Sequence, residues 1–533
     1  MNQRIQSNLP GAAVIVIAMT AFLLLPWLGE TLFNSKGEPR EAIVAVSMLK
    51  YGDWILPQNF GGDIPFKPPF MAWIIAGLAW LFNGGVVNEY LSRLPSALAA
   101  VAMVAGGYFW AKKARGTRFA MIFSFVTITS IEVFRAAWAC RLDMVLTACM
   151  VGAIYVLYDL TERQGRFRAL RWLAAVALLT CATLTKGPVG ALLPCFVIGV
   201  YRLLRHRRFF PTLGAMLLLV VASLAVPALW YYAAYLRGGE EFLDLMLEEN
   251  IGRLTGNMSY ESHVNPWYYN FITLAAGLCP WTLLMLFCLF GLKRFLREPR
   301  TPLTPAALLS LTAAVIIIGF YCIPASKRSV YLLPAYPFIC YGIASAMDSL
   351  AAVRPVKVYT YIISVLAILA PAAVIALQIH SMPGVLPMES IPWWRYAALL
   401  LPAAAGIAWF VNRHSPVGHV LVTVWALYLA YSVAAMPAIL NAKSDKAVVP
   451  QLAAAPAVLV MDDMLRPYTL NFYLDDRIRP VSGWDAVASY PAGTLVLLTE
   501  DYAKSAPEGY SVAELRRKSC DSRRPLYMAT KKQ

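Results

Sequence analysis

The sequence predicts an all-α polytopic membrane protein with a small α/β unit at its C-terminal end. Of its 533 residues, 59% are hydrophobic and only 14% are charged, whereas about a quarter of a soluble globular domain is charged. Apolar runs of membrane-spanning length recur up to residue 440, and shorter apolar runs alternate with polar stretches after it. A single water-soluble globule is therefore excluded.

About thirteen apolar runs approach the length of a spanning helix, which is about 20 residues. They lie at 11–28, 92–111, 119–134, 144–160, 172–184, 188–204, 211–236, 268–292, 303–323, 329–349, 358–378, 394–412 and 416–440. The first follows a single charge, Arg4, and has no small-residue cleavage site, which favours a retained helix over a signal peptide. The run from Phe70 to Asn83 is too short to cross, so we expect it at the outer interface.

The loops between these runs predict the orientation. Basic residues are concentrated at 112–118, 162–171, 202–208 and 293–300, and such loops usually face the cytoplasm. The segments 29–91, 237–267 and 379–393, with the tail from Asn441, are then expected outside. This topology accounts for the net charge of +16, so no nucleic-acid partner is expected.

Two domains are predicted, a transmembrane domain over residues 1–440 and a C-terminal outer domain over 441–533. The first outer loop of the transmembrane domain spans 29–91. In the C-terminal domain, the apolar runs AVLVMDD at 457–463 and TLVLLTE at 494–500 are typical of a small α/β fold. Its role stays open between selecting an acceptor and covering the outer face.

Several familiar kinds of site have no signature in this sequence. The nine cysteines form no CxxC pair, and there is no Walker motif, GxGxxG turn, GxSxG elbow or paired-histidine metal motif. A disulfide framework and a zinc site are therefore not expected, and ATPase, dehydrogenase and hydrolase activities are disfavoured.

Charged and aromatic residues gather at the predicted outer ends of the apolar runs, where a charge is costly unless a function requires it. They are Glu38, Arg40, Lys67, Arg141, Asp143, Lys186, His263, Tyr268, Lys327, Arg328 and Tyr331. The structural alternative is that these residues only anchor helix ends at the interface or, for Glu38 and Arg40, flank a helix that begins at Pro39. The mixture of carboxylates and cations on one face favours a membrane-embedded active site.

Ordered motifs over residues 30–340 carry a family resemblance. They read EPREA, GDWILP, KPPF, RLPSAL, RLDMVLT, LTKGP, ENIGRLTG, NPWYY, PWTLL and SKRSVYLLPAYP. With them the chain resembles the polyprenyl-phosphate-sugar-dependent membrane glycosyltransferases of the GT-C fold, the group that contains aminoarabinose–lipid A transferase and, more remotely, the protein O-mannosyltransferases. The resemblance implies about 13 transmembrane helices, periplasmic juxtamembrane helices, and a location in the bacterial inner membrane with the active site facing the periplasm.

The resemblance also implies a substrate pair. The donor would be a sugar on a polyprenyl (undecaprenyl) phosphate. The acceptor would be a lipid A or lipopolysaccharide-type lipid, another glycan or a protein, and the protein is expected to act as a monomer among membrane lipids. A lipid-linked-sugar transporter or flippase and a non-catalytic scaffold are the rival classes. A transporter should show inverted repeats and charged or broken segments deep in the bilayer, which the sequence does not show.

Roles follow for the candidate residues. Cations would stabilise the negative charge that develops on the leaving phosphate, and a carboxylate could accept the proton of a hydroxyl acceptor. The donor-phosphate residues would be Lys67, Lys186, Lys327, Arg328, Arg40 and Arg141, the catalytic carboxylates Glu38 and Asp143, and the other substrate contacts Tyr331, His263 and Tyr268. The loop from Glu38 to Lys67 is predicted to be a partly mobile lid over the donor.

The chain departs from the family pattern at two places. Members usually carry Asp-Glu where this chain has Gly37-Glu38, so either Glu38 substitutes as the base or the acceptor is already an anion and needs none. Phe66 stands where relatives often have an acidic residue proposed as a metal ligand, and a lone histidine gives poor coordination. We therefore predict no cofactor and no tightly bound metal, with a divalent metal as the open alternative.

Overall fold

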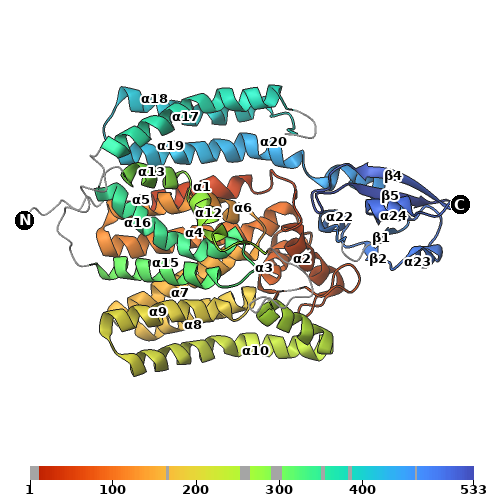
Figure 1. Ribbon diagram of the computed structural model, residues 1–533, viewed down its shortest axis with the longest axis horizontal. Helices are drawn as coiled ribbons and strands as arrows, with labels where there is room; N and C mark the ends of the chain where they lie inside the picture. Colours follow the sequence, from red (N-terminus) through yellow and green to blue (C-terminus); the bar gives the residue numbers. More distant parts are fainter. Residues whose placement is uncertain are drawn as a thin grey trace, which may run out of the picture.

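The computed structural model describes most of the chain, in eight stretches. These are residues 11–65, 67–163, 167–252, 264–289, 303–349, 354–381, 387–461 and 465–532. Long helices form an elongated bundle, and a small unit of strands and short helices lies at one end of it (Figure 1). The predicted fold class, an all-α polytopic membrane protein with a C-terminal α/β unit, is confirmed.

Ten helices of the described residues are long and apolar enough to cross a membrane. They are α4 (Glu89–Arg115), α7 (Leu142–Glu162), α8 (Arg168–Lys186), α9 (Val189–His206), α10 (Phe209–Leu247), α15 (Pro305–Cys322), η3 with α16 (Ser329–Ser349), α17 (Arg354–Ile379), η4 with α18 (Trp393–Val411), and α19 to α20 (Pro416–Asn441). All ten coincide with predicted apolar runs, because a continuous apolar stretch of this length is a strong local signal.

The remaining three predicted spans differ from simple crossing helices. The runs at 119–134 and 268–292 are bent pairs, α5 (Thr117–Ile128) with α6 (Ile131–Trp138) at 66°, and α12 (Tyr269–Gly277) with α13 (Trp281–Leu289) at 99°. Counting each pair as one span gives up to twelve crossings in the described residues. The first run forms α1 (Ala12–Leu24) and a short 3₁₀ turn, which is shorter than a span.

Local chemistry explains both bends. Between α5 and α6, the hydroxyls of Thr129 and Ser130 donate to the carbonyls of Phe125 and Val126, and such local bonds compete with the helical backbone pattern. Between α12 and α13 stands Pro280, which has no backbone N–H to donate. The apolar run alone does not show these breaks; the described residues hold ten unbroken helices of spanning length, and the predicted count of about thirteen crossings stays a prediction.

Two short helices follow α1 and its 3₁₀ turn. Helix α2 (Pro39–Tyr51) begins with a proline at its first position and ends at Gly52, whose φ of 76° is left-handed and whose N–H donates to the Met48 carbonyl. Helix α3 (Phe70–Phe82) is the short apolar run predicted for the interface, and its 13 residues are too few to cross a bilayer. Its outer location remains a prediction.

The C-terminal unit is a five-stranded mixed sheet with short helices. The strand order is β2-β1-β3-β5-β4, with β1 parallel to β2 and β3, and β5 antiparallel to β3 and β4. The strands are β1 (Val458–Val460), β2 (Ile478–Pro480), β3 (Leu495–Leu498), β4 (Tyr510–Arg516) and β5 (Leu526–Lys531), and the helices are η6 (Asp445–Val448), α21 (Val449–Ala453), α22 (Tyr468–Tyr473), α23 (Trp484–Ala488) and α24 (Glu500–Lys504). The two predicted apolar runs hold β1 and β3. The boundary at residue 441 remains a prediction.

The C-terminal unit is fixed to the first loop of the transmembrane domain. The N–H of Phe33 donates to the Tyr473 hydroxyl at 3.0 Å, and the N–H of Phe60 donates to Asp476 at 2.9 Å. Arg466 pairs with Asp63 at 2.6 Å. The beginning and the tip of the loop are thus held against the unit, so the proposed lid motion would have to break these contacts.

Candidate functional site

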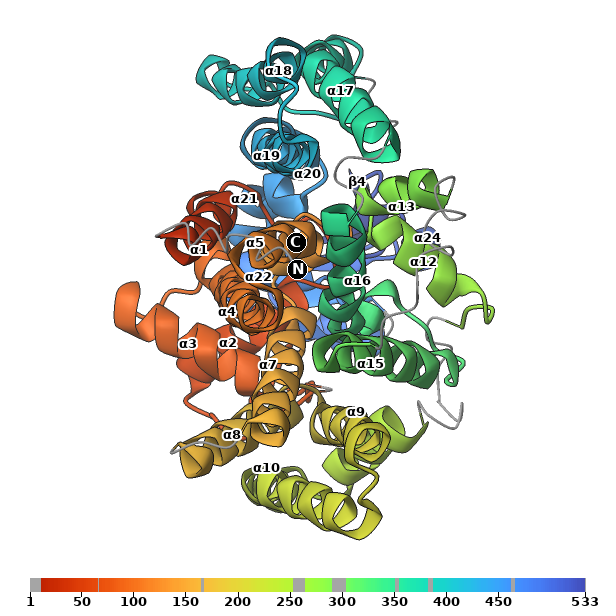
Figure 2. The same ribbon diagram turned by 90° about the vertical axis from the view of Figure 1, so that its left-hand side faces the viewer.

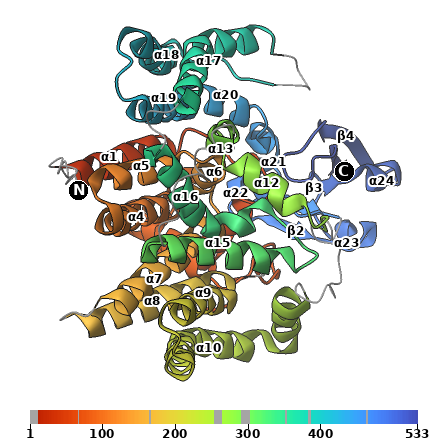
Figure 3. The same ribbon diagram turned by 60° about the vertical axis from the view of Figure 1, so that its left-hand side comes forward.

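A cavity of about 840 Å³ lies between α9, α10 and α15, which stack side by side in Figure 3. Its walls are apolar, with Leu192, Phe196, Leu203, Leu213, Met216, Leu217, Val220 and Phe320 among them. At one end the lining changes to Lys67, Lys186, Glu249, Ser326 and Tyr331. This arrangement suits an amphiphile with a long apolar tail and an anionic head.

Lys67 and Glu249 form an ion pair at the polar end of the cavity. Their Nζ and Oε2 atoms are 2.6 Å apart, and the Glu249 side chain is only 3% exposed. Helix α10 carries the chain past Gly239, where a φ of 57° interrupts the helix, and a short π-helical turn (Glu248–Gly252) follows. This extension brings Glu249 back to the first loop.

Asp143 and Lys186 form a second pair where α7 begins and α8 ends. Lys186 Nζ is 2.6 Å from Asp143 Oδ1 and lies 4.4 Å from the centre of the Tyr331 ring. The placement complements both helix dipoles, because an acid suits the N-terminal turn and a cation suits the C-terminal turn. Gly187, at a φ of 86°, then lets the chain reverse into α9.

Glu38 is buried in a bidentate ion pair with Arg93 of α4. Arg93 Nε donates to Oε1 at 2.8 Å and Nη2 donates to Oε2 at 3.2 Å, and the Cys140 N–H adds a third bond at 3.0 Å. Burial would raise the pKa of Glu38, but the charge and hydrogen bonds of Arg93, the Cys140 N–H and the charge of Arg141 together hold that pKa below its ordinary value.

The Arg93 guanidinium also fixes the backbone that leads to Glu38. Its Nη1 donates to the carbonyls of Leu28 and Thr31 at 2.8 and 2.5 Å, and its plane lies over the Phe33 ring, 5.1 Å from the ring centre. Only 1% of the Arg93 side chain is exposed. Arg93 therefore connects α4 with the whole start of the first loop.

Gly37 leaves room for the guanidinium of Arg141. A Cβ at residue 37 would lie 2.5 Å from Arg141 Nη2, far inside contact distance. Burial lowers the pKa of Arg141, and Asp143 opposes this effect while Arg328 adds to it. In the described residues neither Arg141 nor Arg328 has a carboxylate at ion-pair distance, so this corner carries excess positive charge.

Lys327 holds its own loop rather than lining the cavity. The buried ammonium donates to the carbonyls of Pro324 and Asn265 at 2.7 and 3.3 Å, and Asn265 donates back to the Lys327 carbonyl. The neighbouring Ser326 does line the cavity, and its buried hydroxyl has no hydrogen-bond partner among the described residues.

The other candidates lie at varying distances from this centre. Arg40 pairs with Glu41 at 3.0 Å and is influenced electrostatically by Glu249. Tyr268 is 49% exposed at the start of α12, stacks edge-on with Trp267 and does not line the cavity. His263 lies outside the described residues.

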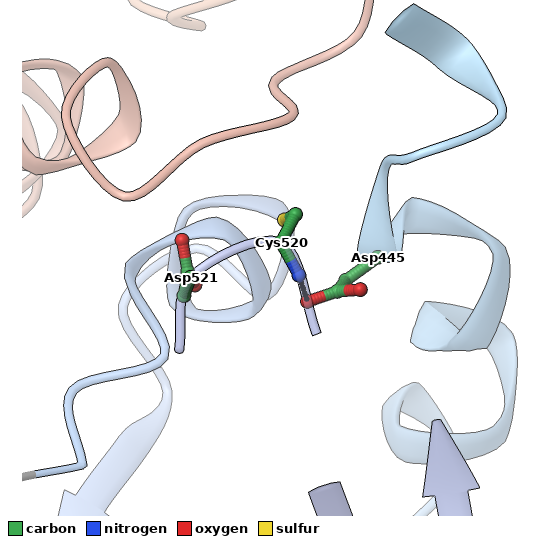
Figure 4. A group of neighbouring side chains, drawn as sticks. All are labelled: Asp445, Cys520 and Asp521. Carbon is green, nitrogen blue, oxygen red and sulfur yellow. Dashed lines mark hydrogen bonds between the residues drawn. The ribbon is translucent and has the colours of Figure 1, made fainter. Parts of the chain in front are cut away.

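One group in the C-terminal unit has the composition of a metal site. The potential ligand atoms of Asp445, Cys520 and Asp521 lie within 4.8 Å of one another, but the two carboxylates lie on either side of Cys520 (Figure 4). Asp445 accepts from Ser519 and from the Cys520 N–H and lies 3.3 Å from an arginine, and Asp521 accepts from the Thr469 N–H and hydroxyl. The carboxylates thus serve as acceptors that tie the 519–521 turn to η6 through Asp445 and to α22 through Asp521.

Three residues of the site were not among the predicted candidates: Arg93, Glu249 and Ser326. Arg93 had a usable signal, because an arginine near the beginning of an apolar helix is costly and needs a partner. Glu249 was visible only as one acid in an acidic loop, and Ser326 only as a neighbour of two cations.

Three comparisons with known proteins bear on the identity of the chain. Residues 66–231 match the family described as dolichyl-phosphate-mannose-protein mannosyltransferase. A protein of Aquifex aeolicus is 28% identical over 390 residues, which cover 70% of this chain and 73% of the relative. An undecaprenyl phosphate-alpha-4-amino-4-deoxy-L-arabinose arabinosyl transferase of Pseudomonas aeruginosa is 26% identical over 60% of this chain, and the alignment spans only 57% of that relative's length.

The fold comparison covers nearly the whole chain. The crystal structure of ArnT from Cupriavidus metallidurans bound to undecaprenyl phosphate superposes with a TM-score of 0.74, over 97% of this chain and 98% of ArnT, at 21% identity. The C-terminal unit is therefore included in the shared architecture. The chain therefore has the GT-C fold of ArnT, and its sequence is similar to the mannosyltransferase family and to undecaprenyl-phosphate sugar transferases.

Proposed function

We propose that this protein transfers a sugar from a polyprenyl phosphate to a lipid-type acceptor at the periplasmic face of the bacterial inner membrane. The observation that carries the proposal is the apolar cavity with Lys67 and Lys186 at its polar end. The apolar walls suit an isoprenoid tail, and the two ammonium groups suit its phosphate. The likeness to an ArnT solved with undecaprenyl phosphate supports the same donor class.

The pairing of each lysine suggests how the donor binds. Glu249 and Asp143 hold the two ammonium groups at 2.6 Å, so the amines are already positioned before an anion arrives. The incoming phosphate would take over part of each pair, with the Ser326 hydroxyl as a further donor. When the bond between the anomeric carbon and the phosphate oxygen breaks, the phosphate keeps the electron pair and the cations stabilise it.

The acceptor is proposed to be an anion, of the lipid A phosphate type. Arg93 holds both oxygens of Glu38, and Lys186 pairs with Oδ1 of Asp143, so the neighbouring cations weaken both carboxylates as bases. An anionic acceptor needs no base, and the excess positive charge of Arg141 and Arg328 would attract it. We assign Glu38 a positioning role, and Arg40 a supporting electrostatic role.

The test is transfer by the purified, membrane-reconstituted full chain. Undecaprenyl-phosphate sugar labelled in the sugar is incubated with lipid A, dephosphorylated lipid A or peptide, and label on the acceptor is measured. We expect transfer to phosphorylated lipid A only, with a loss of about 100-fold or more in Lys186→Met and Lys67→Met. Lys446→Met is the matched control, because Lys446 also pairs with a carboxylate, Glu89 at 3.4 Å, but does not line the cavity. Movement of labelled donor across the membrane without transfer would instead identify a transporter.

A further inference from the structure

A second cavity, of about 460 Å³, lies between α4, α7 and α8; α7 neighbours both of the other helices in Figure 2. Small residues face each other there and leave a hollow: Ala99, Ala102, Gly106, Ala148 and Gly152. Nothing lies within 4 Å of a Cβ placed on Gly106. The hollow opens outward, since Phe109 at its edge is 48% exposed.

The charged edge of this cavity lies toward the opposite end of the bundle from the candidate active site, whereas Val145, two residues after Asp143, lines its other end. Helix α4 begins at Glu89, which accepts from Tyr473 of the C-terminal unit at 2.8 Å, and runs for 27 residues. At a rise of 1.5 Å per residue its last turn is about 40 Å away. The two cavities share no lining residue, and the charged edge of this one, at Lys113 and Asp159, is far from the proposed donor site.

Two cations share one carboxylate at the edge of this cavity. Lys113 Nζ lies 2.6 Å from Asp159 Oδ2, and Arg163 Nε lies 3.6 Å from the other oxygen of Asp159. Lys113 and Asp159 both line the cavity. One positive charge is left over, at the end of the bundle where the basic segments 112–118 and 162–171 occur.

Two polar groups that line the same cavity lack partners. Trp110 and Tyr155 are only 4% and 7% exposed. The Trp110 Nε1–H and the Tyr155 hydroxyl are buried without a hydrogen-bond partner in the part of the chain that the structure describes. Their rings stack at 4.8 Å with an angle of 19°. Buried donors without acceptors are unfavourable. The Tyr155 hydroxyl lies 3.3 Å from a Cβ placed on the buried Gly107, on the inner side of α4, so the Trp110 N–H is the group that points to a ligand with acceptor oxygens.

We propose that this cavity binds one anionic glycerophospholipid from the membrane leaflet on the side of the basic loops. An acyl chain lies along the small residues, an ester carbonyl oxygen accepts from Trp110, and the phosphate lies against Lys113 and Arg163. A lipid is the ligand that combines these three chemistries at membrane depth. A bound lipid would also set the spacing of α7 and α8, whose other ends carry Asp143 and Lys186.

The test is lipid retention by the detergent-purified, delipidated full chain, measured by native mass spectrometry and by thermal unfolding. Phosphatidylglycerol, phosphatidylcholine and water-soluble glycerol phosphate are compared. We expect phosphatidylglycerol to bind roughly fivefold more tightly than phosphatidylcholine, the effect of about one interfacial charge. Soluble glycerol phosphate should give neither adduct nor stabilisation.

Matched variants separate the cavity from general surface charge. Lys113→Glu should weaken phosphatidylglycerol binding by about fivefold or more, and Lys112→Glu, one residue earlier and exposed outside the cavity, by less than about twofold. Gly106→Leu should abolish retention of both lipids, whereas Gly214→Leu on the exposed side of α10 should not. Equal binding of the two phospholipids, equal effects of the two lysine variants, or unchanged retention in Gly106→Leu would overturn the proposal.

Discussion

Replacing Glu38 by glutamine distinguishes a positioning carboxylate from a catalytic base. Glutamine keeps one acceptor oxygen, but its NH₂ group would face an Arg93 N–H that now donates at 3.2 Å, and it leaves the Arg93 guanidinium without a counter-charge. Breaking a buried ion pair by removing one partner costs about 3–5 kcal/mol. We therefore expect Glu38→Gln to lower the free energy of unfolding by about that amount.

Two further variants make the magnitude testable. Glu41→Gln is the matched control, since Glu41 lies three residues on and pairs with an arginine that is 34% exposed, and a pair of that kind contributes only about 0–1 kcal/mol. The double variant Glu38→Leu with Arg93→Leu removes both charges. It should recover more than half of the stability lost in Glu38→Gln, because no uncompensated charge remains.

The assay is guanidinium or urea unfolding in detergent, followed by tryptophan fluorescence, together with transfer rates measured on the folded fraction. The pKa of Glu38 lies below its ordinary value, so the contribution of this pair is complete at neutral pH and is lost as the pH falls below about 4. A Glu38→Gln protein that is as stable as the wild type but about 100-fold or more slower would refute the reasoning and identify Glu38 as the base.

Three shorter predictions address the neighbouring features. Burial raises the pKa of Asp521 to about 7. The C-terminal unit should therefore lose stability as the pH rises from about 4 to about 7, by at most about 4 kcal/mol. In Asp521→Asn, a plot of Tm against pH should no longer fall over this range. Gly37→Ala should displace the Arg141 guanidinium, which now lies where the Cβ would be, and raise the acceptor KM several-fold with little change in Tm. Tyr473→Phe removes the hydroxyl that accepts from the Phe33 N–H and donates to Glu89. The variant should lower the free energy of unfolding by about 1–3 kcal/mol and make the first loop more sensitive to protease. If the loop acts as a lid, a donor analogue should reverse that sensitivity.

The sequence predicted those parts of the fold that depend on local pattern. Continuous apolar runs predicted the ten long helices, and the short run from Phe70 predicted a helix too short to cross the bilayer. Short apolar runs that alternate with polar stretches predicted the C-terminal sheet. Bends are a different kind of feature. The breaks at Thr129 and Pro280 and the left-handed Gly239 alter direction without altering hydropathy, so a count of apolar runs cannot show them.

The candidate site could be predicted as a set of residues but not as a set of partners. A charged side chain near the bilayer is energetically costly unless it has a partner or a function. This cost alone identifies Glu38, Lys67, Asp143 and Lys186 as candidate site residues. Their partners come from 43 to 182 residues away, a separation over which no local pattern carries information.

The partner decides the role of each carboxylate. A carboxylate that lies close to a cation in the sequence could be a proton acceptor or a counter-ion. Only the positions of the two side chains in the structure distinguish these roles. Two hydrogen bonds from Arg93 make Glu38 a weak base, while the space above Gly37 leaves Arg141 without an acid at ion-pair distance in the described residues. Gly37, where the family resemblance leads us to expect an aspartate, thus leaves the Arg141 cation without an acid beside it, which fits the proposed anionic acceptor.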